Sequence, residues 1–211
     1  MIGRFAYWDC QKEGHALQDL REQEIYQTAI RVFAENGFEK TTMEGIAAQA
    51  KVAKGTLFYR YNNKEELFVQ IVQYALKRVF ESSQEALADI AKPGDKLAVI
   101  LAVQIGLAAQ NPNMAKLIFR EAWGAIEQHP PLREQLEAYL QYIEVIVAEG
   151  VQSGELRTLD SRQVAMAMFW MVASATFSLT YEPDRHDPRQ LADEVTRQFL
   201  TGIQGEISHA H

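Results

Sequence analysis

The sequence predicts an all-α protein of about nine helices, in which a three-helix unit of helix-turn-helix type is followed by a larger helical body. Two observations predict this fold. Apolar residues recur at helical spacing through most of the 211 residues, in stretches separated by Gly, Pro, Asn and Asp. Residues 41–67 also contain a short amphipathic helix, an interruption and a second short helix.

The first clear helix is predicted to begin at residue 21. It is expected to end at Asn36 and Gly37, which tolerate the left-handed backbone of a helix C-terminus. Its apolar face comprises Ile25, Ala29, Val32 and Phe33. Residues 1–20 have no sustained period, so we predict that they form an N-terminal tail.

The helix-turn-helix pattern occupies residues 41–67. Thr41 or Thr42 can cap the first short helix, whose apolar residues recur at i, i+3, i+4 and i+7. A Lys-Val-Ala-Lys-Gly segment then interrupts the pattern. The second short helix combines hydroxyl groups, rings and charge between Thr56 and Tyr61. A core helix would seldom expose this mixture, which suits the groove of a nucleic-acid duplex.

This segment resembles the DNA-binding domain of the TetR family of transcriptional repressors. The matching features are a Thr-Thr pair, an Ile-Ala-x-x-Ala helix, a Val in the turn, Lys-Gly-Thr-Leu-Phe-Tyr and a closing Lys-Glu-Glu-Leu. They occur in the order and spacing of the family. The resemblance implies a helix-turn-helix DNA-binding domain at residues 21–67 and a ligand-binding and dimerisation domain at residues 68–211.

The resemblance also implies which side chains contact the phosphates of DNA. The candidates from the family pattern are Thr42, Tyr59 and Lys64. Lys51, which departs from that pattern, is a further candidate because its cation could lie near a phosphate. Thr42 has an alternative role as a helix cap, and Lys64 could be a solvated side chain beside two glutamates.

Contacts with base edges are expected from the second short helix. Arg reads guanine through two hydrogen bonds, and Thr can contact the methyl group of thymine. The candidates are Lys54, Thr56 and Arg60. Gly55 would let the backbone approach the DNA closely, whereas Leu57 and Phe58 are predicted to be core residues.

Two positions depart from the family pattern. Lys51 stands where the family usually has Gly, and a left-handed Lys costs on the order of 1 kcal/mol. Ala53 stands where Ser or Thr usually caps the recognition helix, and a missing cap costs about 0.5–2 kcal/mol. Both predict a recognition helix that is more loosely held than usual.

Charge is distributed unevenly along the chain, whose formal net charge is −7. Residues 36–64 contain five basic and two acidic side chains, whereas residues 68–211 contain 12 basic and 18 acidic ones. A basic end on an acidic body is typical of a protein that touches phosphate at one end only. A basic N-terminal arm in the minor groove is the alternative for residues 1–20, but acidic residues outnumber basic ones there.

Six further helices are predicted in the body, each bounded by Pro, Gly, Asn or Asp. Their expected ranges are 64–91, 95–110, 114–128, 132–153, 161–180 and 188–207.

The helix at 161–180 is apolar on nearly every side, so we expect it to face both a second subunit and an internal cavity. In the family the last two helices form a four-helix homodimer interface. Such a dimer places two recognition helices about 34–36 Å apart, which predicts an inverted-repeat operator in double-stranded DNA.

The resemblance places a small-molecule effector inside the body. Large, flexible or aromatic residues on the surrounding helices are its candidate contacts, although each could be an ordinary core residue. They are Met114, Trp123, Tyr139, Tyr142, Met166, Phe169 and Trp170. Arg120 and Glu121 could anchor a polar group of the ligand if they are buried. The composition favours a bulky, largely apolar effector, and no cofactor is predicted.

Several classes of function have little support. No catalytic triad, Gly-rich phosphate loop or paired metal ligands occur, so an enzyme is not expected. His209 and His211 are expected to belong to a terminal tail, and Cys10 is the only cysteine, which suits a reducing cytoplasm. The sequence contains no run of about 18 apolar residues that could span a membrane, so the chain is expected to be soluble. The alternatives are a small-molecule carrier without DNA binding, a helical hydrolase or isomerase, and a transcriptional activator.

Overall fold

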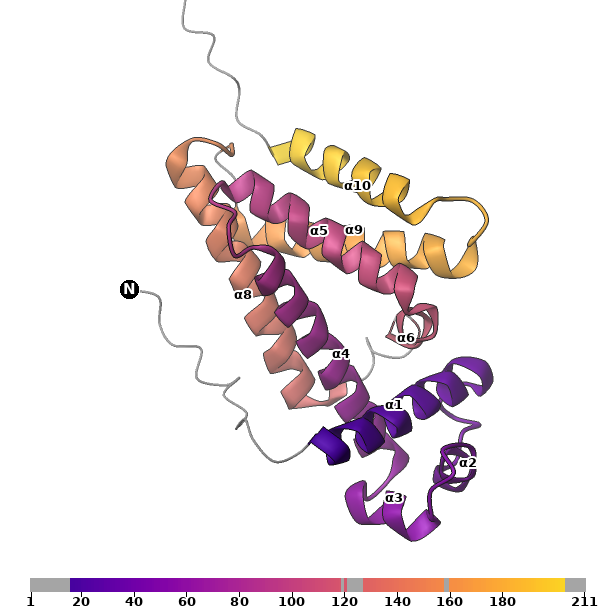
Figure 1. Cartoon of the computed structure of the whole chain (residues 1–211). Helices are drawn as coiled ribbons and strands as arrows, with labels where there is room; N and C mark the ends of the chain where they lie inside the picture. The colour runs from indigo at the N-terminus through magenta and orange to yellow at the C-terminus, as the bar shows by residue number, and fades with distance from the viewer. Residues whose placement is uncertain (1–15, 119, 121–126, 158–159, 204–211) are drawn as a thin grey trace, which may run out of the picture.

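The computed structural model describes residues 16–118, 120, 127–157 and 160–203. These residues form nine helices and no strand, which confirms the predicted all-α fold (Figure 1). The helices are α1 (Ala16–Asn36), α2 (Met43–Gln49), α3 (Lys54–Arg60), α4 (Lys64–Ala86), α5 (Pro93–Gln110), α6 (Pro112–Leu117), α8 (Pro130–Ser153), α9 (Ser161–Tyr181) and α10 (Pro188–Ile203).

Proline is the first residue of four helices in the body, including Pro188 of α10, whose start at residue 188 agrees with the prediction. Pro93, Pro112 and Pro130 each lie in the first turn of a helix, where the ring replaces an N–H that has no partner within the helix. The predicted starts at residues 95, 114 and 132 are therefore each slightly late. Helix α1 likewise begins before residue 21, and α4 ends at Ala86 rather than near residue 91.

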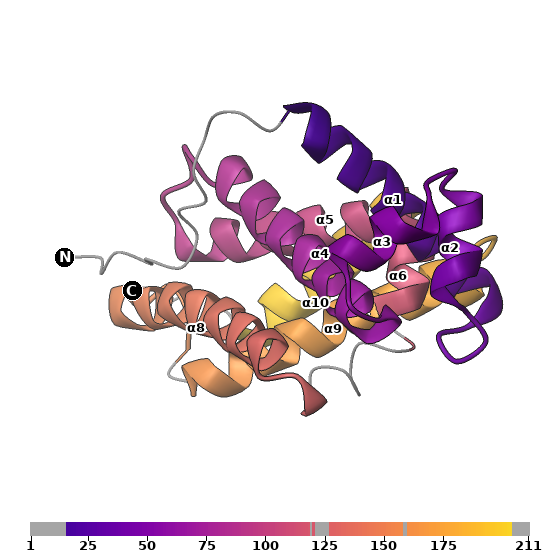
Figure 2. The same ribbon diagram turned by 90° about the horizontal axis from the view of Figure 1, so that it is seen from below.

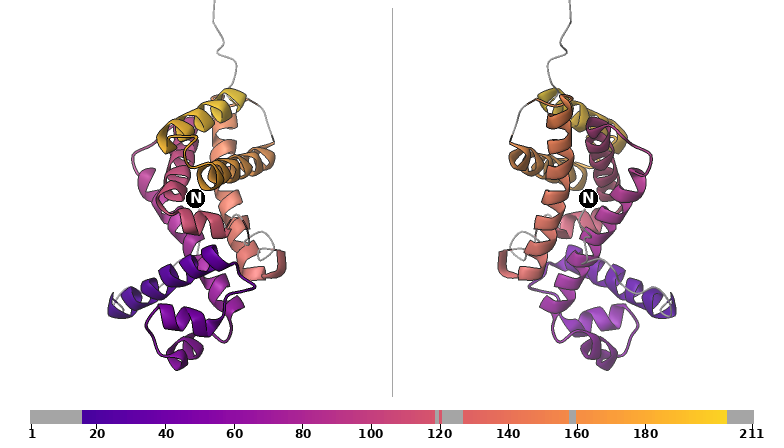
Figure 3. Two further views of the ribbon diagram at one scale, coloured as in Figure 1. Left: turned by 90° about the vertical axis from the view of Figure 1, so that its right-hand side faces the viewer. Right: turned by 90° about the vertical axis from the view of Figure 1, so that its left-hand side faces the viewer.

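The first core cluster holds α1, α2, α3 and α4 together at the N-terminal end of the molecule. Phe33 is completely buried, and its ring lies 5.5 Å from that of Phe38 and 6.0 Å from that of Phe68 between ring centroids. Leu117 of α6 and Leu132 of α8 belong to the same cluster. The helix-turn-helix unit therefore shares its core with the body (Figure 3).

The second core cluster lies in the body, among α5, α8, α9 and α10. Helix α5 packs against α4, α8, α9 and α10, and it lies at the centre of this arrangement (Figures 1 and 2). Helix α6 packs against both α1 and α9. It therefore connects the DNA-binding unit to the helix that we expect at the dimer interface.

Helix α9 has the length and composition of a membrane span, since its 21 residues include an 18-residue window with a mean hydropathy of 1.4. The expectation that no stretch of the sequence passes this test is therefore wrong. One such helix is weak evidence for a membrane protein, because the core helix of a soluble protein passes the same test. In this fold α9 contributes Val164, Ala165 and Met168 to the second core cluster.

Candidate DNA-binding surface and effector region

The turn between α2 and α3 is held in the conformation that the sequence predicts. Lys51 has a φ of 54°, and it is the only residue other than Gly with a positive φ among the residues that the structure describes. Backbone hydrogen bonds hold this turn, with the N–H of Val52 donating to the carbonyl of Ala47 at 3.0 Å. The side chain of Lys51 is exposed. The strained backbone thus presents a cation beside the recognition helix.

The two short helices begin differently. Thr42 caps α2, since its Oγ1 accepts a hydrogen bond from the N–H of Gly45 at 3.1 Å. The capping role of Thr42 is confirmed, and its hydroxyl hydrogen remains able to reach a phosphate. Ala53 has the extended backbone of an N-cap but offers no side-chain hydrogen bond to α3. The missing cap that the sequence predicts is therefore present in the structure.

Helix α3 presents most of its surface to solvent. Leu57 is its only buried residue, which confirms that prediction, whereas Tyr59 is 92% exposed. The prediction that Phe58 is a core residue is wrong, since its side chain is 37% exposed. Lys54, Gly55 and Thr56 are also exposed. A Cβ placed on Gly55 would meet no atom within 4 Å, so the fold itself does not require glycine there.

An ion pair links the two helices on this surface. The Nζ of Lys54 lies 2.7 Å from a carboxylate oxygen of Glu44 in the first turn of α2, and both side chains are more than half exposed. This hydrogen bond from Lys54 lowers the pKa of the Glu44 carboxyl. Lys54 also lies 5.4 Å from the ring centroid of Phe58. In this structure the candidate base-reading lysine is therefore engaged by a carboxylate.

The C-terminal end of α3 is fixed by buried tyrosines. Tyr61 follows Arg60 directly and is 1% exposed, and its hydroxyl donates to Glu22 of α1 at 3.0 Å. The Tyr26 hydroxyl lies 3.2 Å from Oε1 of Gln70 on α4. Burial raises the pKa of Tyr61 well above its usual range and that of Tyr26 to about 12. These hydroxyl contacts join the residue that follows the partly buried Arg60 to α1, and α1 to α4.

Lys64 connects α4 to the segment between α1 and α2. Its ammonium donates to the carbonyl of Phe38 at 2.9 Å and to that of Glu39 at 3.1 Å, and it lies 4.5 Å from the Phe38 ring centroid. The alternative of a merely solvated lysine is therefore wrong. An ammonium has three hydrogens, so one remains for a phosphate, and that contact stays a prediction.

The candidate effector residues do not converge on one described cavity. Met114 packs against the first core cluster, and Met166 and Phe169 pack against the second. Trp170 is 49% exposed on the outer side of α9, so the structure places it away from the interior that the sequence predicts. Trp123 lies outside the described residues, as do Glu121 and the terminal segments that contain Cys10, His209 and His211.

Arg120 does not reach into the body as a ligand anchor. Its guanidinium donates to the carbonyl of Phe33 in the last turn of α1 at 2.8 Å, where the N–H of Gly37 also donates at 2.9 Å. A cation at this position complements the negative end of the helix dipole. Arg120 thus joins the segment after α6 to the end of α1.

Tyr139 and Tyr142 lie on α8, and both pack against the second core cluster. The Tyr139 hydroxyl accepts a hydrogen bond of 2.5 Å from Nε2 of Gln104 on α5. Burial raises the pKa of Tyr139 to about 12 and also raises that of Tyr142. The Tyr142 ring lies 5.1 Å from that of Phe80 on α4. The two tyrosines therefore lie where α4, α5 and α8 meet.

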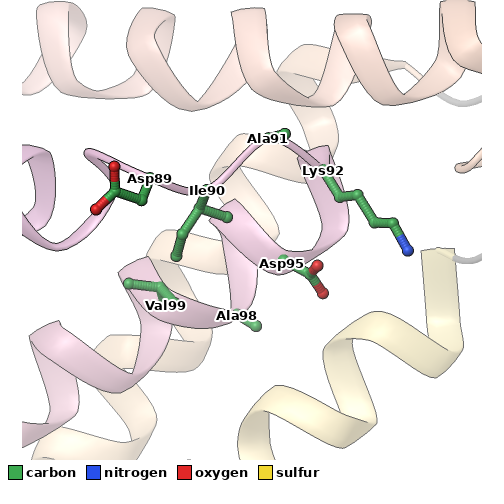
Figure 4. A pocket seen from close by; sticks show the side chains of 7 residues that line it. All are labelled: Asp89, Ile90, Ala91, Lys92, Asp95, Ala98 and Val99. Carbon is green, nitrogen blue, oxygen red and sulfur yellow. The ribbon is translucent and has the colours of Figure 1, made fainter.

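Two surface hollows are described. One, of about 540 Å³, lies at the turn from α4 to α5, where Lys92 and Asp95 point outward (Figure 4). The other, of about 480 Å³, is a largely apolar groove between α9 and α10 that includes Ala167 and Met171. Neither is lined by a candidate effector residue. Within the described residues, no group of three or more His, Cys, Asp or Glu is placed to hold a metal ion.

Comparison with known proteins gives matches to both parts of the chain. Residues 25–71 match the bacterial regulatory proteins of the tetR family, and residues 91–203 match the tetracyclin repressor-like C-terminal domain. The fatty acid metabolism regulator protein of Bacillus subtilis (strain 168) is 27% identical over 187 residues, covering 87% of this chain and 95% of that protein.

Two solved structures are similar over nearly their whole length. The transcriptional regulator FadR from Bacillus subtilis in complex with stearoyl-CoA has 27% identity and a TM-score of 0.77, covering 86% of this chain and 99% of that chain. AibR in complex with isovaleryl coenzyme A and operator DNA has 25% identity and a TM-score of 0.73, covering 84% and 97% respectively.

The exposed recognition helix, its basic residues and the helical body define a DNA-binding transcriptional regulator of helix-turn-helix type. The two domain matches assign its family, and the second alone spans more than half of the chain. The chain belongs to the TetR family and is a ligand-responsive, DNA-binding repressor, not an enzyme. This assignment removes the hydrolase and isomerase alternatives, and it favours a repressor over an activator or a carrier without DNA binding.

Proposed function

We propose that this repressor is released from its operator by a coenzyme A thioester of a fatty or branched-chain acid. The observation that carries the proposal is that both similar solved structures contain such a ligand: stearoyl-CoA in FadR and isovaleryl coenzyme A in AibR. The sequence identity is 27% to FadR and 25% to AibR, and each match covers more than four fifths of this chain. The shared part therefore includes the body and not the DNA-binding domain alone.

The composition of the body supports an acyl group as part of the effector. The second core cluster is built from aliphatic and aromatic side chains, and several of its neighbours are only partly buried. Those neighbours include Tyr139, Tyr142, Met166 and Phe169. Long, adaptable side chains of this kind can rearrange around an apolar chain at low cost. We propose these four, with Met114, as effector contacts.

We also propose that the repressor is a homodimer through α9 and α10, as is typical of the family. The exposed residues of α9 recur at alternating spacings of four and three, which is the repeat of a helix-packing seam. We call them the α9 seam: Gln163, Ala167, Trp170, Ser174, Phe177 and Tyr181. The exposed aromatic residues Trp170, Phe177 and Tyr181 lie on this one face. Their burial by a second subunit would supply much of the dimer interface.

The groove between α9 and α10 supports the same interface. It is lined partly by Gln163 and Ala167 of the α9 seam, and partly by Gln198, Phe199 and Gly202 of α10. Small residues at its edge allow close approach of another helix. In a two-fold dimer the same groove occurs on both subunits, so the pairing is self-complementary.

For the DNA contacts, we propose two groups of residues on one surface. Lys54, Gly55, Thr56 and Arg60 would face the bases, and Thr42, Lys51, Tyr59 and Lys64 would face the phosphates. The exposure of α3 and the positive local charge support this assignment. We propose that the repressor acts in the cytoplasm, as its family of soluble DNA-binding regulators implies.

Binding to DNA and release by ligand are tested in one experiment. The purified protein is titrated with duplex fragments from around its own gene at several salt concentrations, and its oligomeric state is measured by light scattering. We expect a dimer to bind an inverted repeat, with affinity that falls as salt rises. Stearoyl-CoA and isovaleryl coenzyme A are then added, with coenzyme A alone as the control. If neither thioester released the protein from the DNA, the proposed effector would be contradicted.

A further inference from the structure

We infer that Gln104 and Tyr139 form a binding site for a neutral carbonyl oxygen, so that the repressor distinguishes an acyl thioester from the corresponding free acid. Gln135 would accept a hydrogen bond from an N–H group of the same ligand. This inference rests on the proposed function, because it assigns one chemical group of the proposed effector to named side chains. It goes beyond that function, because it predicts which ligands are rejected.

The hydrogen bond between the two side chains leaves a donor available. Gln104 is 7% exposed on α5, between fully buried apolar residues such as Leu101 and Ile105. Its Nε2 donates to the Tyr139 hydroxyl oxygen at 2.5 Å. The hydroxyl hydrogen must therefore point elsewhere, and no described residue accepts it. Because burial raises the pKa of Tyr139 to about 12, the group remains a protonated donor at neutral pH.

Gln135 supplies the complementary acceptor. It lies one helical turn before Tyr139 on α8, so the two side chains share a face of the helix. Its Oε1 is buried and has no hydrogen-bond partner among the described residues. A buried carbonyl oxygen without a partner is unfavourable, so a ligand that donates to it gains affinity. One donor and one buried acceptor thus lie one helical turn apart on the same face of α8.

The surroundings of Tyr139 favour a neutral ligand group. Burial and, to a lesser extent, Tyr142 raise its pKa against the opposing hydrogen bond from Gln104, and no cation of the described part of the chain is among the causes. A carboxylate placed against this hydroxyl would lose its hydration without gaining an opposite charge. A thioester carbonyl is polar but uncharged, so it can accept the hydroxyl hydrogen without that penalty. The peptide-like amides of coenzyme A have N–H groups that can donate to Oε1 of Gln135.

A ligand can approach these groups from the side of α4. Leu136, Tyr139 and Tyr142 are only partly buried, whereas Leu140 and Ile143 of the same helix are buried against the second core cluster. The ring of Phe80 on α4 contacts Tyr142 at 5.1 Å between centroids. An acyl chain that displaces these rings could reach Gln104 and Tyr139 while the core formed by α5, α9 and α10 remains closed.

The test compares a thioester with two reference ligands: a thioether that lacks only the carbonyl oxygen, and the free acid, which also lacks coenzyme A. Full-length protein is titrated by calorimetry with stearoyl-CoA, with the thioether S-octadecyl-CoA, which lacks the carbonyl oxygen, and with stearic acid. We expect the wild-type protein to bind the thioester about three- to tenfold more tightly than the thioether, the range expected for one neutral hydrogen bond. Stearic acid should bind more weakly than either.

Variants then assign the preference to the two side chains. In Tyr139→Phe the difference between thioester and thioether should disappear, and Gln104→Met should reduce it because Tyr139 loses its positioning partner. Tyr74→Phe is the matched control, because its ring contacts Tyr26 near the DNA-binding unit. Operator binding by each variant verifies that the protein is folded.

The outcomes separate the inference from the proposed function. If the wild-type protein binds no acyl thioester, both are overturned. If it binds the thioester, thioether and acid equally, the carbonyl site is overturned and the proposed effector class stands, and this comparison needs no variant. A preference for the thioester that Tyr139→Phe leaves unchanged likewise overturns the assignment to this pair.

Discussion

Helices α3 and α9 each expose a distinct surface, and the two surfaces differ in the kinds of side chain that they present. Helix α3 has seven residues, buries only Leu57, and displays Lys54, Thr56 and Tyr59. Helix α9 has 21 residues and exposes Trp170, Phe177 and Tyr181 in a regular repeat. The first surface faces a partner of constant chemistry, the DNA duplex, whereas the second is the one that we propose faces a copy of itself. Residue identity therefore indicates the role of α3, and only periodicity and exposure support the role proposed for α9.

The largest effect is expected from a charge in the α9 seam. Phe177→Glu places two carboxylates in the proposed two-fold interface, where neither has a partner. We expect the dimer to dissociate and operator affinity to fall by at least about 100-fold, because each monomer reaches a single half-site. Light scattering and DNA titration measure the two effects together.

Val145→Glu is the matched control for this variant. Val145 is 51% exposed on α8 but lies outside the α9 seam, so the same charge should leave the dimer intact. Because Phe177 is itself 42% exposed, Phe177→Glu should keep its helix content. A Phe177→Glu protein that remains a tight dimer would contradict the proposed interface.

The second prediction concerns the base contacts of α3. Arg60→Ala should cost about 1–3 kcal/mol of operator binding and relax the preference at one base pair, since a two-bond contact with guanine is lost. Tyr61 continues to fix the end of α3, so little change in unfolding temperature is expected. Competition titrations with operators mutated one base pair at a time measure the preference.

Arg185→Ala controls for the loss of one positive charge. Arg185 is paired with Glu182 at 2.8 Å in the turn after α9, away from the recognition helix. It should leave operator affinity and the salt dependence unchanged. If Arg60→Ala weakened all sequences equally, Arg60 would contact a phosphate rather than a base.

The local backbone structure of the DNA-binding domain could be predicted from the sequence to the level of single residues. The left-handed Lys51, the uncapped Ala53 and the cap at Thr42 follow from local backbone chemistry, which a motif specifies. The exposure of Phe58 and the contacts of Lys64 could not be predicted, because the first depends on how α3 packs in the fold and the second joins segments distant in sequence. Phe58 lies near Lys54 on the surface, and Lys64 bonds to carbonyl groups far away in sequence.

The body was less predictable for a related reason. The composition of an apolar helix such as α9 does not reveal which of its sides is buried. The sequence therefore predicts an interior position for Trp170, whereas its side chain is 49% exposed. Arg120 and Gln104 are polar residues in apolar stretches, and their meaning depends on a partner in another helix. Helix periodicity identifies the elements, whereas tertiary pairing decides the role of each polar group.

The third prediction tests the ion pair between α2 and α3. In the free protein Glu44 engages Lys54 at 2.7 Å, and a phosphate or base must compete with this carboxylate. Glu44→Gln removes the competing charge, so operator affinity should rise by about two- to fivefold, more at low salt than at high salt. Glu35→Gln is the control, because Glu35 pairs with Arg31 within α1 at 3.8 Å. Equal affinities for Glu44→Gln and the wild type would show that the ion pair does not oppose DNA binding.

The smallest effect is expected from restoring the missing cap of α3. Residue 53 already has φ −63° and ψ 138°, the extended backbone from which a serine hydroxyl can accept an N–H of the first turn. Ala53→Ser should therefore raise the free energy of unfolding by about 0.5–1 kcal/mol. Amide hydrogen exchange should slow in α3 more than in the body helices, because the gain is local. Ala48→Ser places the same residue on the exposed face of α2, away from any N-cap, and should give no such gain. If Ala53→Ser slowed amide exchange in α3 no more than Ala48→Ser, the absent cap would have no role in the dynamics of the recognition helix.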